Sequence, residues 1–565
     1  MPAAFNFSSK ARMLPAIQNK QGIVHIFNYL ITKTLMKYRF AIVLTILFSS
    51  KVLGQRIEKE FLIENKYLNI PIEMKQERQR VQFVLGEDTL TYGEIRIADD
   101  KIDYWVFADL SKWTGEKLKL TFSDQVKGID QIYQSNKIEG EDSLYRETNR
   151  PQFHFTTRRG WNNDPNGLLY LDGEYHLFYQ HNPYETQWGN MHWGHAVSKD
   201  LLHWEELNPA LYPDKMGTMF SGSAVIDEKN TGGWGKNTMV AFYTAAGKNM
   251  TQNLAYSTDK GRTFSKYAGN PILGPDRDPK VFWHKSSGVW VMVLYEDNYF
   301  AIYNSKDLKK WEYKSKIKGF FECPELFELP VDGNENNKKW VMYGASGTYM
   351  TGDFDGEVFT PEQGKYFYSW GSQYAAQTFN NLPDERRIQM SWGRIEQPGM
   401  PFNQMMLFPT ELTLRTTREG IRLFCEPISE IAKLHDKRYT WKDLTCEEAN
   451  KKLKGIDNEL LHVIMDVEIE HGLDLKILFK GNPVIHYDGN FNRFNGAPYT
   501  CIYPGIFRFN IELLIDKTSI ECYIDKGKLF ISEALNKSTK NDGLQLEGDI
   551  KIHSLEAYEM KSIWE

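Results

Sequence analysis

Three acidic residues lie in short and unusual sequence settings. Asp164 lies in WNNDPNG, Asp278 in DRDPK and Glu322 in FECPE. Taken singly, each setting is compatible with a structural turn, because Asn, Asp, Pro and Gly are the residues that turns favour. Brought together, such carboxylates supply a general acid, a general base and a nucleophile without any cofactor. The next question is whether the elements that carry them bring them together.

A motif with a period near 50 residues recurs along the middle of the chain. Its copies are SKDLLHW from Ser198, a looser STDKGRTF from Ser257, SKDLKKW from Ser305 and a remnant, GDFDG, from Gly352, with starts 59, 48 and 47 residues apart. Such a period among short strands and turns is typical of a β-propeller. The region of about 260 residues then predicts five blades. The aspartates of the repeat are expected to cap turns: Asp200, Asp259 and Asp307.

The acidic motifs occupy a similar phase of this repeat. Asp164 precedes the first copy by 34 residues, Asp278 precedes the third by 27 and Glu322 precedes the remnant by 30, while Ser223 precedes the second copy by 34. In a propeller the same phase means the same radial position, so we expect four inner strands to deliver these residues to the central funnel. Converging carboxylates among Asn, Gln and Trp side chains indicate cleavage of a glycosidic bond, which needs a protonated acid and an ionised carboxylate.

At these residues the sequence resembles glycoside hydrolase family 32, the β-fructofuranosidases that include invertases, inulinases and levanases. WNNDPNG is the most specific block. RDP and EC support the match because they follow it along the chain in this order. The other matching blocks are FYQHNP (178–183), WGNMHWGHA (188–196), FSGS (220–223) and YAAQTF (374–379). The resemblance runs from about Tyr145 to the C-terminus. It implies an all-β chain in which a five-bladed β-propeller is followed by a C-terminal β-sandwich.

The resemblance also implies a role for each carboxylate. Asp164 would be the nucleophile that forms a fructosyl-enzyme in a retaining mechanism, and Glu322 would be the acid/base. Asp278, with Arg277, would hold fructose hydroxyls and stabilise the transition state. Further residues match family positions that line the fructose pocket: Asn163, Gln180, Trp188, Phe220 and Ser221. No cofactor and no metal are expected, and the motif leaves open whether Trp188 lines the pocket or belongs to the core.

One position departs from the family pattern. Where many members have DYGKFYA, this chain has SWGSQYA, so Ser369 replaces an acidic residue on the leaving-group side. The +1 specificity, and with it any preference for sucrose, is therefore open. The implied mechanism assigns no task to four histidines, which are expected to be structural: His181, His192, His195 and His203.

Outside a propeller at 150–410, the sequence predicts two further β-sandwiches. Short alternating strands predict a small accessory module at 56–135, followed by a polar linker at 136–149. This module resembles an accessory domain found ahead of family members in Bacteroidetes-type bacteria. Strands without the repeat predict a C-terminal β-sandwich at 411–565. Residues 1–54 are interpreted as an upstream segment and a signal peptide.

The signal peptide is expected at about 36–54. A basic MKYR run precedes nine apolar residues from Phe40 to Phe48, and VLG resembles a cleavage site before Gln55. Nine residues are too few to span a bilayer, which takes about 20. There is no adjacent Cys for a lipid anchor. We therefore expect an exported protein, periplasmic or extracellular, whose mature chain has no membrane span.

Composition excludes several other classes of protein. Of the 565 residues, 41% are hydrophobic and 25% charged, which excludes a disordered chain and a polytopic membrane protein. A net charge of −6 over this length gives no indication of a nucleic-acid partner. The cysteines lack zinc-ligand spacing and are expected to be mostly buried thiols: Cys323, Cys425, Cys446, Cys501 and Cys522.

The leading hypothesis is an exo-acting fructan hydrolase that releases fructose from levan or inulin. An endo-levanase or a sucrose-cleaving invertase shares these residues and differs in the loops at the funnel mouth. A fructosyltransferase, a non-catalytic fructan-binding protein and an arabinan-degrading hydrolase are the weaker alternatives. The expected partner is a fructan polysaccharide or oligosaccharide, and the oligomeric state is left open.

Overall fold

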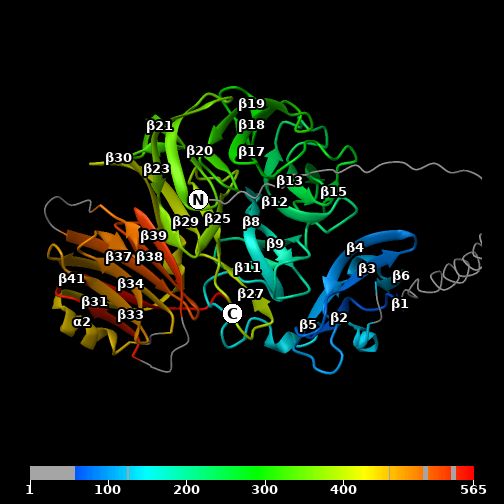
Figure 1. The fold of residues 1–565 in the computed structure, drawn as a ribbon, viewed down its shortest axis with the longest axis horizontal. Helices are drawn as coiled ribbons and strands as arrows, with labels where there is room; N and C mark the ends of the chain where they lie inside the picture. The colour runs from blue at the N-terminus through cyan, green and yellow to red at the C-terminus, as the bar shows by residue number, and fades with distance from the viewer. Residues whose placement is uncertain (1–56, 124–125, 457–458, 501–506, 536–541, 565) are drawn as a thin grey trace, which may run out of the picture. The chain divides into compact units, whose positions relative to one another are not determined.

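The computed structural model describes most of the chain as β-strands (Figure 1). The described residues are 57–123, 126–456, 459–500, 507–535 and 542–564. The expected signal peptide and Cys501 lie outside these ranges. Among the described residues, no helix has the length and apolar character that crossing a bilayer requires.

The N-terminal part of the described chain forms two small sheets. One has the strand order β1-β6-β3-β4 and the other β5-β2-β7. In β3, buried Val81, Phe83 and Leu85 alternate with more exposed residues, which is the pattern of a strand with one face on a core. The strand bounds are β1 (Ile57–Leu62), β2 (Tyr67–Ile72), β3 (Gln79–Leu85), β4 (Asp88–Ile95), β5 (Tyr104–Asp109), β6 (Lys117–Phe122) and β7 (Tyr133–Ser135).

The next strands form the five blades of a propeller, of which blades four and five share one nine-stranded sheet. Blade one has β8 (Gly160–Leu171), β9 (Glu174–Asn182), β10 (His192–Ser198) and β11 (Trp204–Glu206). Blade two has β12 (Thr218–Asp227), β13 (Thr238–Ala246), β14 (Met250–Ser257) and β15 (Ser265–Lys266). Blade three has β16 (Arg277–His284), β17 (Val289–Glu296), β18 (Tyr299–Ser305) and β19 (Glu312–Lys318). Blade four has β20 (Glu325–Val331), β21 (Asn334–Tyr343), β22 (Thr348–Phe354) and β23 (Phe359–Phe367). Blade five has β25 (Gln373–Thr378), β26 (Ile388–Gly393), β28 (Met405–Met406), β29 (Thr410–Thr417) and β30 (Gly420–Pro427).

The first strands of the blades form the inner ring. β8 contacts both β12 and β25, and β12 contacts β16. Between β26 and β28 of blade five, β27 (Phe402–Asn403) pairs in parallel with the start of β8, which ties the last blade to the first. The aspartates of the repeat sit at turns, as expected: each accepts backbone N–H groups two to four residues further on, at Leu202 and His203, at Thr263, and at Lys309 and Lys310.

The C-terminal part is a sandwich of two sheets. One runs β24-β39-β38-β37-β32-β41-β31 and the other β36-β35-β34-β33-β40. In β32 the buried residues alternate along the strand and join the apolar core between the sheets. The bounds are β24 (Ser369–Gly371), β31 (His435–Thr445), β32 (Leu461–Ile469), β33 (Leu475–Phe479), β34 (Asn482–Asp488), β35 (Arg493–Phe494), β36 (Ala497–Pro498), β37 (Phe507–Ile515), β38 (Ser519–Ile524), β39 (Leu529–Ala534), β40 (Leu544–Glu547), β41 (Ile550–Met560) and α2 (Cys446–Leu453).

The all-β class and the order of propeller and sandwich are confirmed. One detail differs from expectation. The outer strands β29 and β30 extend blade five to Pro427, past the predicted boundary at residue 410, because blade five lacks the repeat motif that marks the other blades. The C-terminal part also contains a short helix, α2. Residues from Glu58 to Glu565 form one compact unit.

Candidate active site

Irregular strand pairings occur where the inner strands carry the candidate residues. The pairing of β8 shifts register across Asn163 and Asp164, that of β12 across Ser221, and that of β16 across Asp278 and Pro279. A bulge inserts extra residues into one strand and re-aims their side chains. The bulges in the inner strands therefore point these side chains in directions that a regular strand would not give them.

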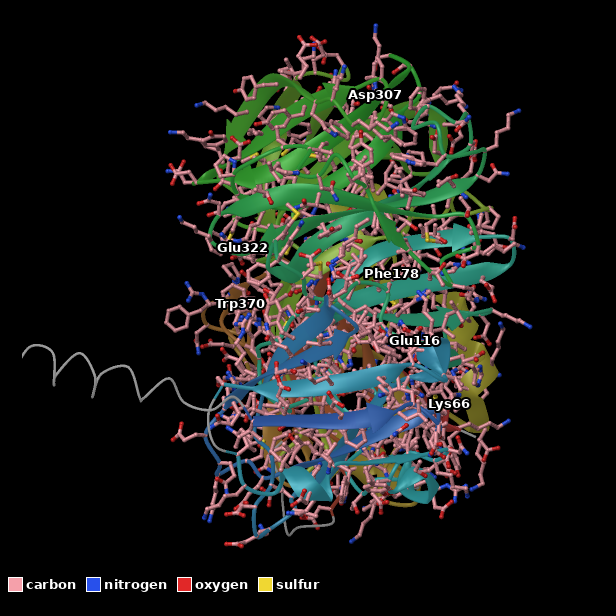
Figure 2. The ribbon with its side chains drawn as sticks, turned by 90° about the vertical axis from the view of Figure 1, so that its right-hand side faces the viewer. Lys66, Glu116, Phe178, Asp307, Glu322 and Trp370 are labelled. Atoms are coloured by element: carbon pink, nitrogen blue, oxygen red, sulfur yellow. The ribbon has the colours of Figure 1, made fainter. Side chains whose placement is uncertain are left out.

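Left-handed backbone conformations gather in the same place. The φ angle is 65° at Asp278, 47° at Glu322, 43° at Cys323 and 49° at Ala375. Residues other than glycine rarely adopt positive φ, and such conformations cluster where function requires a particular side-chain direction. Glu322 and Cys323 form the turn that enters β20, and Figure 2 labels Glu322 on the propeller, above the N-terminal module.

Asp164 is held by two neutral donors. Ser221 Oγ donates to Asp164 Oδ2 at 2.6 Å, and Asn163 Nδ2 donates to Oδ1 at 3.2 Å. Trp161 Nε1 in turn donates to Asn163 Oδ1 at 2.9 Å, which orients the amide. Burial raises the pKa of Asp164, and the two hydrogen bonds oppose that effect by stabilising the ionised form.

Asp278 is buried, with 6% of its surface exposed. Its Oδ2 accepts a hydrogen bond from the backbone N–H of Cys323 at 3.2 Å, and its own N–H donates to Thr244 Oγ1 at 3.0 Å. Burial, and after it the charge of Asp164, raise the pKa of Asp278 to about 7. The charge of Asp164 therefore affects the protonation of Asp278.

Glu322 has a donor on each carboxylate oxygen. Arg277 Nη2 donates to Oε1 at 2.5 Å, and Tyr374 Oη donates to Oε2 at 2.6 Å. The Arg277 guanidinium also stacks over the ring of Tyr295, 5.0 Å from its centroid. About 23% of the Glu322 side chain is exposed, so the carboxylate is fixed and yet open to the funnel.

The thiol of Cys323 lies beside two of the three carboxylates. Its Sγ lies 3.7 Å from Asp164 Oδ2 and 3.8 Å from Asp278 Oδ2, and the residue follows Glu322 in the chain. Burial, together with the neighbouring negative charges, raises the pKa of this thiol well above its usual range. The structure thus brings together all three residues that the sequence singled out, with Cys323 as a neutral neighbour.

The remaining expected pocket residues surround this group. Trp188 is 52% exposed and its ring packs edge-on against Phe220, with 5.9 Å between centroids, so it does not belong to the core. Gln180 is buried on β9, and its Nε2 has no hydrogen-bond partner among the described residues. Buried amide groups are nearly always paired, which is consistent with a polar partner supplied from the funnel. Asn163 and Ser221 contact Asp164 directly, as given above.

Sequence reasoning missed the role of Tyr374. This residue stands in the YAAQTF block, and its hydroxyl contacts Glu322, but a tyrosine in an inner strand is also a common core residue. Ser369, at the position that departs from the family pattern, lies next to the C-terminal sandwich. It is buried in β24, which pairs in parallel with β39 of the C-terminal sandwich, Ser369 opposite Phe530.

Four histidines of the first blade have local partners. His181 Nδ1 lies 2.8 Å from the carbonyl oxygen of Trp161, and His176 and His195 pair through their ring nitrogens at 3.1 Å. Burial lowers the pKa of each of these three histidines, which favours neutral rings. His203 lies in the first repeat turn, beside Asp200.

Comparison with known proteins assigns this arrangement to a family. The family model for the N-terminal domain of glycosyl hydrolases family 32 matches residues 154–427. A levanase of Bacillus subtilis (strain 168) is 39% identical over 488 residues, which cover 75% of this chain and 72% of that protein. The chain belongs to glycoside hydrolase family 32. It is therefore a glycosidase, and the resemblance based on WNNDPNG, RDP and EC is confirmed.

Other members of family 32 extend the similarity. A levanbiose-producing levanase of the same Bacillus strain is 30% identical over 499 residues, which cover 76% of this chain and 94% of that enzyme. The crystal structure of an exo-inulinase from Aspergillus awamori has a TM-score of 0.66 and 28% identity, covering 74% of this chain and 100% of that one.

Proposed function

We propose that this chain is an exo-acting, retaining fructan hydrolase that releases fructose from levan or inulin. The observation that carries the proposal is the convergence of Asp164, Asp278 and Glu322 at the inner ring of the propeller. There the Cys323 thiol contacts Asp164 and Asp278, and Arg277 links Asp278 to Glu322. The levanase and exo-inulinase names of its relatives support a β-fructoside as substrate.

The proposed reaction has two steps. In the first, a carboxylate oxygen of Asp164 attacks the anomeric carbon of the terminal fructosyl unit while Glu322 gives its proton to the departing oxygen. The bond to the rest of the chain breaks and a fructosyl ester forms on Asp164. In the second, Glu322 takes a proton from water, the resulting oxygen attacks the same carbon, and fructose leaves with Asp164 restored.

The contacts of each residue fit its proposed task. Ser221 and Asn163 stabilise the charge of Asp164 and hold it in one orientation, which a nucleophile requires. Tyr374 and Arg277 fix both oxygens of Glu322 while leaving it partly open to a leaving group. Asp278, buried beside Asp164, is placed to accept hydrogen bonds from fructose hydroxyls, together with Arg277.

An endo-levanase is the second candidate. The 30% identity to a levanbiose-producing levanase, over 94% of that enzyme, favours it specifically. Both candidates share the three carboxylates and differ in how much polymer the funnel mouth admits. We further propose that the protein is exported, because the basic and apolar segment before Gln55 has the pattern of a signal peptide.

Product analysis tests the proposal. The protein from Gln55 onward is incubated separately with levan, inulin and sucrose, beside Asp164→Asn and Glu322→Gln. Fructose as the sole early product from a polymer, lost in both variants, is expected, and the faster polymer identifies the linkage. Early oligosaccharides from levan would establish endo action instead. No product from any of the three substrates would overturn the proposed function.

A further inference from the structure

The loop that carries Trp188 joins β9 to β10 and reaches the candidate site. Trp188 packs against Phe220, and the next residue, Ser221, donates to Asp164. A shift of this loop would therefore move an exposed indole at the edge of the proposed fructose pocket. The contacts that hold this loop therefore affect how the proposed pocket binds substrate.

The middle of the loop is held from the N-terminal module by two arginines. Glu185 has a fully buried side chain, and its Oε2 accepts hydrogen bonds from Arg78 at 2.7 and 2.9 Å and from Arg96 at 2.6 Å. Arg78 Nη2 also donates to the carbonyl oxygen of Trp188 at 3.3 Å. A buried carboxylate is costly without such partners, so these contacts strongly constrain the loop.

The two ends of the loop are held by the same module. Asn190 pairs with the backbone of Glu94 in β4, accepting from its N–H at 2.7 Å and donating to its carbonyl oxygen at 2.8 Å. Tyr184 stacks on Phe83 of β3, with 5.9 Å between ring centroids, and covers Gly93, where an added Cβ would lie 2.9 Å from the Tyr184 ring. The module lies beside the first blade in both views (Figures 1 and 2).

We propose that the N-terminal module forms part of the substrate site by positioning Trp188, with Arg78 and Arg96 as positioning residues. The catalytic carboxylates all come from the propeller, whereas one aromatic wall of the pocket is held from outside it. The inference deepens the proposed function and rests on it, because it takes the funnel around Asp164 as the place where fructan binds. It assigns the module a role in substrate affinity, in addition to packing.

The test compares five full-length variants with the wild type on levan and inulin. Arg78→Met removes the contacts to Glu185 and to the Trp188 carbonyl oxygen. Asn190→Gly removes the side-chain pairing with Glu94, and glycine tolerates the positive φ of 46° at this position. Trp188→Ala and the Arg78→Met/Trp188→Ala double variant complete a mutant cycle. Arg80→Met is the matched control.

Arg80 suits this comparison because it lies in β3, two residues after Arg78, which immediately precedes this strand. Its guanidinium stacks on Tyr92 of the same module, 4.1 Å from the ring centroid. Replacing it removes one positive charge from the module without touching the loop contacts given above.

We expect Arg78→Met to raise KM about tenfold, since a hydrogen bond to a charged partner typically accounts for a factor of this size, with kcat changed by less than about twofold. Asn190→Gly should also raise KM, and Arg80→Met should leave KM unchanged. In the Trp188→Ala background, Arg78→Met should have little further effect on KM, because its effect passes through the indole.

Two results would overturn the inference. One is a KM for Arg78→Met and Asn190→Gly that equals the KM of Arg80→Met, with melting temperatures showing folded protein. The other is an increase in KM on Arg78→Met that is as large in the Trp188→Ala background as in the wild type. Failure of the proposed function is distinct, since it would appear as a wild type without activity on either polymer.

Discussion

A buried ion pair at the junction of propeller and sandwich makes the stability of this protein depend on pH. His154 is fully buried, with Nδ1 2.8 Å from Asp516 Oδ2 and Nε2 2.8 Å from Glu521 Oε1. Asp516 also accepts the backbone N–H groups of Gln152 and Phe153. The histidine thus joins the entry to the propeller to two carboxylates of the C-terminal sandwich.

The size of the effect follows from the pKa of His154. Burial by itself lowers this pKa, but the hydrogen bonds and charges of Asp516 and Glu521 outweigh burial and raise it from 6.5 to about 9. Each pKa unit corresponds to about 1.4 kcal/mol, so the charged histidine contributes about 3 kcal/mol to the free energy of unfolding. Because the folded-state pKa is the higher one, this contribution is complete below pH 6.5 and is lost as pH rises through about 9.

Urea unfolding of the wild type and of His154→Gln at several pH values between 6 and 9.5 measures this contribution. The difference in unfolding free energy between the two proteins should shrink by about 3 kcal/mol across the range, whatever constant loss of packing the substitution causes. His203→Gln is the control, since His203 is half exposed beside Asp200. A difference between wild type and His154→Gln that stays constant with pH would refute the reasoning.

Three further outcomes follow from the contacts. In Asp164→Asn, the charge that helps to raise the pKa of Asp278 to about 7 is gone, so Asp278 should titrate at lower pH by NMR; an unchanged value would contradict the coupling. Tyr374→Phe removes a donor from Glu322 and should lower kcat about tenfold with little change in melting temperature, and wild-type kcat would argue against a catalytic contact. Thr445→Ala removes the cap of α2 and should cost about 1 kcal/mol in urea unfolding, whereas an unchanged midpoint would show that the cap contributes nothing.

Much of the fold could be predicted because its signals are local and repeated. The Ser and Asp of each repeat form a turn through hydrogen bonds within a few residues, so the period is visible in the sequence. Blade five lacks this turn, and its outer strands therefore escaped prediction. Helix α2 has a local signal that was not used: Thr445 and Glu448 form a capping box, the pattern Thr-x-x-Glu.

The three carboxylates could be singled out from their motifs, but not the contacts that hold them. That Tyr374 reaches Glu322 across 52 residues depends on how blade five closes against blade four. The contact between Arg78 and the carbonyl oxygen of Trp188 likewise joins residues 110 positions apart in the chain. Such long-range contacts depend on how the blades pack, so the spacing of motifs in the sequence does not predict them.

The central claim is that Asp164 carries the fructosyl group and Glu322 serves as acid and base. The most direct measurement is a mass spectrum of peptides from Glu322→Gln after reaction with a β-fructosyl donor whose leaving group needs no proton. Without a base for the second step, the account predicts that the peptide containing Asp164 gains the mass of one fructosyl unit, and that Asp164→Asn/Glu322→Gln shows no such gain. A fructosyl adduct on another residue, or one that persists in the double variant, would contradict the account.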